Sequence, residues 1–206
     1  MSMPHNELLT IFPGREHISY EQMNTIFSIE KLWVDLSFWI RDLSLSTNYN
    51  LPNLHATTNQ VMNVMPMKFY NSLRVFYGPE IAQLFLNNLT NLLANILHLM
   101  NAYKEYDKSA VDSSTVQLYQ SADTFADLLS RINIYWDKNQ WKYLFRQYAK
   151  LNISQIVVIA GQSNNHDLEM NLFYQIQDLS LIEGSYMARG IIADKSVVKR
   201  LGAELI

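Results

Sequence analysis

Hydrophobic residues recur every three or four positions along most of this chain, and that spacing predicts α-helices separated by short polar breaks. The predicted helices run from Ser28 to about Thr47, from Leu54 to Tyr77, from Pro79 to about Tyr106, from after Ser114 to about Ile134, from Asp137 through Ile156, and from near Asn165 to about Ile192. About six helices with short loops favour an all-α antiparallel bundle of the four-helix-bundle or ferritin-like kind. We therefore expect an N-terminal arm (1–24), a helical-bundle domain (25–192) and a C-terminal tail (193–206).

Local signals set the expected helix ends. Ser28 is of a type that commonly caps a first helical turn, so we place the first N-terminus there. Pro66 lies inside the second predicted helix and indicates a kink or a break. The pair Gly78-Pro79 joins a favoured C-terminal cap to a favoured first helical residue, which predicts the end of one helix and the start of another.

A pattern of about 45 residues occurs twice in the chain, about 60 positions apart. Before the break in each copy, Phe69, Leu73 and Phe76 match Leu128, Ile132 and Tyr135. After the break, Ile81, Leu84, Phe85, Leu93 and Ile96 match Trp141, Leu144, Phe145, Ile153 and Ile156. Copies at a fixed spacing predict a duplicated helix–break–helix unit, with an internal pseudo-twofold axis and the first and sixth helices in equivalent outer positions.

The composition indicates a surface with few charged residues. The 206 residues are 49% hydrophobic and only 17% charged, so much of the surface must be uncharged Asn, Gln, Ser and Thr. Such a surface favours association with another copy or another protein over mutual repulsion. A net charge of -3 offers no electrostatic basis for binding nucleic acid.

The chain contains no cysteine, which excludes disulfides, thiolate catalysis and cysteine-based metal sites. No signal-peptide pattern is present, and no window approaches roughly 18 uninterrupted apolar residues. We therefore expect a soluble protein of the cytoplasm, without a membrane span.

The segment from Ile156 to Asn164, IVVIAGQSN, looks like the strand and nucleophile block of carbohydrate esterases in the SGNH hydrolase superfamily. In such enzymes a serine attacks the ester carbonyl and a histidine removes its proton. Here no histidine follows His166, so Ser163 would lack a base from a distant element. The favoured alternative is a buried helix end capped at Gly161, with Ser163 capping the next helix.

Metal binding is a second candidate chemistry, because helical bundles hold paired metal ions through inward carboxylates and Glu-x-x-His pairs. The five histidines are widely scattered, and neither a Glu-x-x-His nor a His-x-x-x-His spacing occurs. We therefore assign no metal ligand, no cofactor and no catalytic residue.

Glu30 and Arg41 are the charged pair to which we give a candidate role. They lie eleven residues apart, and eleven residues turn a helix by three revolutions plus about 20°, so both lie on one face. Three turns are too many for a direct ion pair, so each needs a partner such as Asp178 or Glu183 on the sixth predicted helix. The four residues indicate either a buried polar network that fixes helix register or a pocket for a small ligand.

The segments 30–41 (EKLWVDLSFWIR), 50–54 (NLPNL) and 76–80 (FYGPE) resemble uncharacterised helical-bundle proteins of spore-forming bacteria, some of them labelled acetylglutamate kinase. The resemblance spans residues 28–190 and implies a helical bundle with a role in sporulation, in the cytoplasm of the mother cell or in the spore. The kinase label conflicts with the residues, because the six glycines form neither a GxGxxG nor a GxxxxGK phosphate loop.

The same opening also looks distantly like duplicated ferritin-like bundles, in which a glutamate and a histidine on one helix hold a metal. Arg41 stands where that histidine is expected, and the run Asp167-Leu168-Glu169 is not followed by a histidine. The resemblance therefore implies a metal site that has been lost.

From these observations we expect a non-catalytic helical-bundle protein that acts in self-association, scaffolding or protein binding. Its partner would be another copy of itself or another protein. The alternative is a bundle that binds a metal or a small ligand around Glu30, Arg41, Asp178 and Glu183.

Overall fold

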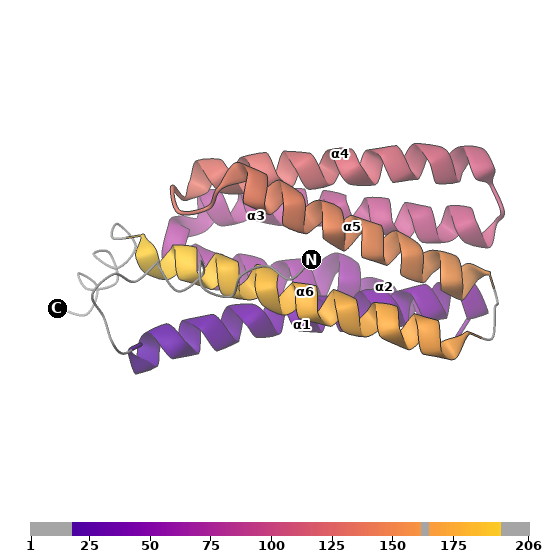
Figure 1. Cartoon of the computed structure of the whole chain (residues 1–206), viewed down its shortest axis with the longest axis horizontal. Coiled ribbons are helices and arrows are strands. Elements are labelled where there is room, and N and C mark those ends of the chain that lie inside the picture. The colour runs from indigo at the N-terminus through magenta and orange to yellow at the C-terminus, as the bar shows by residue number, and fades with distance from the viewer. Residues whose placement is uncertain (1–17, 162–164, 195–206) are drawn as a thin grey trace.

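The computed structural model describes residues 18–161 and 165–194. Within these ranges every regular element is helical: α1 (Tyr20–Tyr49), α2 (Leu54–Asn59), the π-helical turn η2 (Gln60–Val64), α3 (Met65–Lys104), α4 (Lys108–Ile132), α5 (Lys138–Ala160) and α6 (His166–Ala193). The helices lie side by side along the long axis of the molecule (Figure 1). The prediction of an all-α bundle is confirmed. None of these helices is long and apolar enough to cross a membrane.

The first helix begins earlier than its apolar spacing predicts. The Gln22 backbone N–H donates to Ser19 Oγ at 3.2 Å, and the Gln22 side chain accepts from the Ser19 N–H at 2.9 Å. This reciprocal capping box satisfies two N–H groups that would otherwise lack a partner, so α1 begins at Tyr20. The expected N-cap at Ser28 is wrong, and residues 20–24, assigned to the N-terminal arm, are helical.

The backbone is rearranged at Pro66, as its place inside a predicted helix indicates. Proline has no N–H to donate to the carbonyl four residues earlier. The chain accommodates this in η2, where the Met65 N–H bonds to the Gln60 carbonyl, five residues back. Pro66 then lies in the first turn of α3, where a missing N–H costs least.

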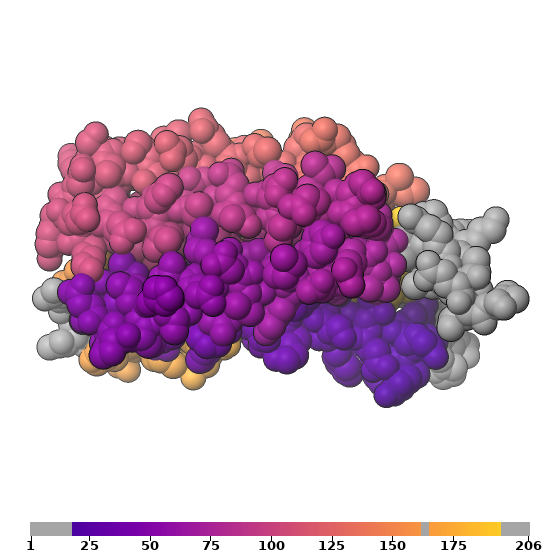
Figure 2. Space-filling model, turned by 180° about the vertical axis from the view of Figure 1, so that it is seen from behind, coloured from indigo at the N-terminus to yellow at the C-terminus, as the bar shows by residue number. Residues whose placement is uncertain are grey.

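The third helix folds back on itself at Gly78, which has a φ of 82°. The Phe69 and Phe85 rings, one on each side of Gly78, stack with centroids 5.5 Å apart. In a straight helix the two residues would be separated by roughly 24 Å. α3 therefore consists of two arms that meet at Gly78, and the break predicted at Gly78-Pro79 is confirmed. Figure 2 shows the face on which α2, both arms of α3 and α4 lie together.

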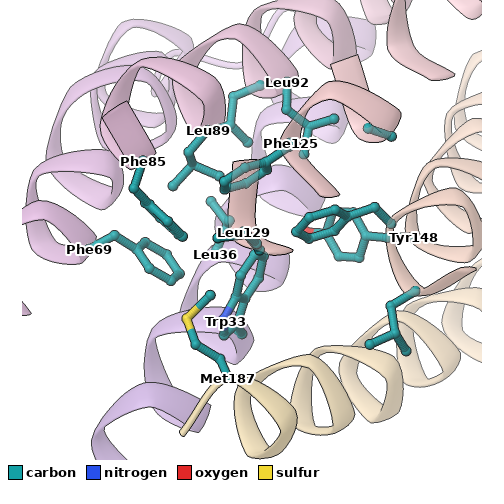
Figure 3. Close-up of a cluster of buried hydrophobic side chains, with 14 of the residues drawn as sticks. Trp33, Leu36, Phe69, Phe85, Leu89, Leu92, Phe125, Leu129, Tyr148 and Met187 are labelled. Atoms are coloured by element: carbon teal, nitrogen blue, oxygen red, sulfur yellow. The ribbon is translucent and has the colours of Figure 1, made fainter. Parts of the chain in front are cut away.

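The centre of the bundle is built from aromatic rings contributed by different helices (Figure 3). Trp33 of α1 contacts Phe69 edge-on at 5.0 Å and lies 5.9 Å from Phe145 of α5. Phe125 of α4 stacks on Phe145 at 4.8 Å and meets Phe85 at 4.9 Å. All five rings are buried. Edge-on and stacked contacts of this kind add to the stabilisation from area burial, so this cluster joins α1, α3, α4 and α5 into one core.

The predicted repeat matches the structure at some positions and not at others. Phe85 and Phe145 are both buried, as are Ile96 and Ile156. Leu144 is buried, whereas its expected counterpart Leu84 is 49% exposed. The internal duplication and the count of about six helices therefore stay predictions.

Both ends of α5 and the start of α6 lie close to the predicted positions. Asp137 caps α5, because its side chain accepts a hydrogen bond from the Gln140 N–H at 2.8 Å. Gly161 is the C-cap of α5, as the pattern indicates. Asn165 caps α6 through the Leu168 N–H. Ser163, and the part of the predicted tail from residue 195 onward, lie outside the described residues.

Candidate functional site

The polar residues that we expected to form a site lie along the contact between α1 and α6, which run in opposite directions (Figure 1). The two backbones touch at Gly184, where an added Cβ would lie 2.5 Å from Glu30 Cα and 3.0 Å from Glu30 N. Only a glycine fits such an approach. The sequence therefore brings α1 and α6 closer here than larger side chains would permit.

The Glu30 side chain forms a hydrogen bond next to this contact. The Ser185 hydroxyl donates a hydrogen bond to Glu30 Oε1. The Glu30 side chain is half-buried, at the margin of the α1–α6 contact. The Glu30–Ser185 hydrogen bond thus ties α1 to α6.

Arg41 forms a bidentate ion pair that joins α1 to α6. Its Nε and Nη2 atoms donate to the two carboxylate oxygens of Glu169 at 2.7 and 2.8 Å. Gln155 of α5 donates to the same carboxylate at 2.9 Å. The guanidinium also lies 4.8 Å from the centre of the Phe173 ring. The bidentate hydrogen bonds to Glu169 raise the pKa of Arg41.

This geometry corrects the expected pairing. We predicted that Arg41 meets Asp178 or Glu183, but it meets Glu169. Asp178 is exposed on the outer side of α6 and takes no part in the network. The cause is the register of the antiparallel pair: with Glu30 opposite Ser185, a residue eleven positions further along α1 must lie far back along α6, near its N-terminus. Glu169 and Gln155 were missed because register follows from tertiary packing.

Glu183 is buried in the bundle, and neither carboxylate oxygen has a hydrogen-bond partner. Burial raises the pKa of this carboxyl well above its ordinary value of 4.5. Burial therefore favours the protonated, uncharged form of this carboxyl. A neutral carboxylic acid can donate one hydrogen bond and accept others, and it can give up its proton.

Other buried side-chain atoms of the described residues also lack hydrogen-bond partners. They include Trp33 Nε1, Trp141 Nε1, Tyr148 Oη and Ser180 Oγ. Tyr148 lies close enough to Glu183 for the acid to raise the pKa of its hydroxyl, after the larger effect of burial. Ser180 precedes Glu183 by three residues and so shares its face of α6. In Figure 3 the Tyr148 and Trp33 side chains enter the same part of the core. The sequence gives no local signal for the proximity of Tyr148 and Glu183, because the two residues come from different helices.

The surface grooves lie away from these polar groups. One, of about 250 Å³, lies between α1 and the first arm of α3 and is lined by Asn24, Thr25, Ser28, Ile29, Ser72, Val75 and Phe76. The other, of about 430 Å³, lies beside η2 and is lined by Met62, Asn63, Pro66, Met67, Leu86, Asn87 and Thr90. Neither contains an ionisable side chain, so neither has the groups that acid–base catalysis needs.

The described residues bear on both chemistries considered from the sequence, metal binding and ester hydrolysis. In the described ranges no three His, Cys, Asp or Glu residues lie close enough to hold a metal ion. The IVVIA segment, which resembles an esterase strand, forms the last turns of α5 and is helical. A strand that ends in a nucleophile turn is therefore not formed there.

Comparison of the chain with protein-family models, with curated proteins and with solved structures gives no match.

Proposed function

We propose that this protein is a non-catalytic helical bundle that associates with a second copy of itself through the outer face of α1 and α6. The observation that carries the proposal is a set of exposed aromatic and aliphatic side chains on that face. Tyr20, Phe27 and Phe38 of α1 are 70%, 58% and 49% exposed, and Tyr174 and Leu181 of α6 are 58% and 44% exposed. We call these five residues the outer stripe.

Helix geometry places the members of the outer stripe in line. Steps of seven and eleven residues separate Tyr20, Phe27 and Phe38, and each returns to within about 20° of the same direction. Tyr174 and Leu181 are also seven residues apart. The two rows meet where the Phe38 ring lies 6.5 Å from Phe173, which lies 6.2 Å from Tyr174. The stripe therefore continues across both helices.

The size of this face indicates how strong the association should be. From Tyr20 to Phe38 the α1 row extends roughly 27 Å, from Tyr174 to Leu181 the α6 row extends roughly 10 Å, and each helix is roughly 10 Å wide. Each copy would then bury about 370 Å², or about 740 Å² for the pair, below the ~1,000 Å² typical of stable specific interfaces. We therefore expect a weak, reversible dimer whose dissociation constant lies in the upper micromolar range.

Charge on the same face allows two copies to approach. Lys31 lies within the stripe and is paired with Asp35 of its own helix at 2.8 Å, while Asp178 is exposed on α6. A surface with both signs and few charges presents little repulsion to a copy of itself. Polar residues at the margin of an apolar centre are also the usual arrangement of a protein interface.

Sedimentation equilibrium between about 5 and 500 µM tests the proposal. The wild type should change from monomer to dimer across this range, and Phe27→Glu with Leu181→Glu should keep the chain monomeric because it buries two charges in the interface. Val116→Glu is the matched control, since Val116 is 56% exposed on α4, away from the stripe. A wild type that stays monomeric, or a Val116→Glu variant that dissociates equally, would refute self-association through this face.

A monomeric wild type would indicate that the protein binds a different protein instead of a second copy of itself. The resemblance to proteins of spore-forming bacteria suggests sporulation as the process in which this assembly acts. Normal yields of heat-resistant spores from a strain lacking the gene would count against that role.

A further inference from the structure

Glu183 is a buried acid that has no evident role in the proposed association or in the packing of the core. It lies in the body of α6, far from both ends, so it caps no helix. Its carboxylate oxygens accept no hydrogen bond, and its side chain is fully buried. Unpaired buried polar groups cost free energy, and a natural core keeps such a cost mainly at sites with a role.

The packing around Glu183 leaves a charge there no access to water. At the neighbouring Gly184 the α6 backbone touches Glu30 of α1. Six residues further, at Gly190, an added Cβ would lie 2.0 Å from Trp136 Nε1. The Trp136 indole also donates to the Met187 carbonyl at 3.2 Å. These contacts hold α6 on both sides, so hydrating an ionised Glu183 requires α6 to move.

Among residues 18–161 and 165–194, no positive group is found to stabilise the ionised form of Glu183. Burial alone raises the pKa of Glu183. The ionisable group that faces it from α5 is Tyr148. On α1, Glu30 touches the neighbouring Gly184, and its carboxylate accepts a hydrogen bond from Ser185. Arg41 lies four turns away along α6 and is paired with Glu169. The closed structure therefore selects the protonated acid.

We propose that Glu183 and the two glycine contacts form a pH-sensitive latch, in which α6 is held against α1 and α5 while Glu183 is protonated and is released when Glu183 ionises. In the released state the carboxylate reaches water, and the nearby Tyr148 hydroxyl and Ser180 hydroxyl are uncovered as well. The proton goes to solvent, and no other reactant is needed. Raising the pH therefore favours the open form, because the closed form binds more protons at this site.

Hydrogen–deuterium exchange as a function of pH tests the latch on the full chain. Protection factors, which remove the intrinsic pH dependence of exchange, should fall in α6 as the pH rises above 4.5, the ordinary value for Glu183. The fall should be as steep as tenfold per pH unit until the folded pKa is passed. Protection in α4, which does not contact Glu183, should change much less and serves as the internal reference.

Two variants of the same helix separate the latch from general effects of charge. Glu183→Gln removes the ionisable group and should make α6 protection independent of pH. Asp178→Asn removes an exposed carboxylate from α6 and should behave as the wild type. An unchanged pH dependence in Glu183→Gln, or an equal loss of it in Asp178→Asn, overturns the proposal.

Infrared spectroscopy of the wild type keeps the test independent of how the variants fold. A carboxylic-acid C=O band from one buried acid should persist above pH 4.5 and should disappear over the same range in which α6 protection falls. Loss of that band at the ordinary pKa of glutamate, or at a pH unrelated to the change in α6, would contradict the latch.

Discussion

Replacing Arg41 by methionine tests whether the pair Arg41–Glu169 holds α1 against α6. The pair is largely enclosed, with side-chain exposures of 22% for Arg41 and 10% for Glu169. Removing one member of a buried ion pair costs about 3–5 kcal/mol, because the other charge stays buried without compensation. Gln155 still donates to Glu169 in the variant, and Arg41 is partly exposed, so we expect a loss at the lower end, about 3 kcal/mol.

Urea unfolding followed by circular dichroism measures this loss, and a thermal scan gives a second reading. For a chain of this size about 3 kcal/mol corresponds to a fall in Tm of roughly 6–12 °C. Glu169→Met should cost less, since the exposed part of Arg41 can reach water. The double variant Arg41→Met with Glu169→Met should recover most of the loss, because it removes the buried charge altogether.

Two results would show that this reasoning is wrong. A loss below about 1 kcal/mol in Arg41→Met would place the pair among exposed salt bridges of little consequence. Additive losses in the double variant would show that the two side chains do not interact energetically.

Further predictions follow from the close contacts and the titrating groups. Gly184→Ala should destabilise the fold by about 1–3 kcal/mol in urea unfolding, because its methyl group meets the Glu30 backbone 2.5 Å away. Gly78→Ala should cost about 1 kcal/mol in the same assay, because a φ of 82° strains any side chain; no loss would mean that the corner relaxes. Glu183→Gln should raise the unfolding free energy at pH 7, and the gain should shrink as the pH falls and vanish below pH 4.5, where the wild-type acid is protonated in both states; a gain that is constant with pH would contradict the raised pKa.

The local features of the fold were predictable because their causes are local. Pro66 lacks an N–H and Gly78 tolerates a positive φ, so both breaks follow from single residues. The buried face of each long helix follows from the spacing of its apolar residues. The start of α1 was missed because Tyr20 and Phe27 face outward, so that the apolar period there does not mark a buried face.

The polar contacts were less predictable because they depend on how helices are aligned. Sequence spacing places Glu30 and Arg41 on one face of α1, as observed, but it contains no information on which turn of α6 lies opposite. The contact at Gly184 sets that alignment, and Glu169 becomes the partner of Arg41 as a result. The burial of Glu183 without a partner is likewise a consequence of three helices meeting.

Cysteine cross-linking at Lys31 tests self-association through the outer stripe most directly. Lys31 lies near the middle of the stripe and its side chain is 72% exposed, so a twofold axis through the stripe brings its two copies close together. The chain has no cysteine of its own, so Lys31→Cys introduces a single thiol. Under mild oxidation the account predicts a disulfide-linked dimer whose yield rises with protein concentration, while Val116→Cys stays monomeric. Equal yields from the two variants, or no dimer from Lys31→Cys at several hundred micromolar, would contradict it.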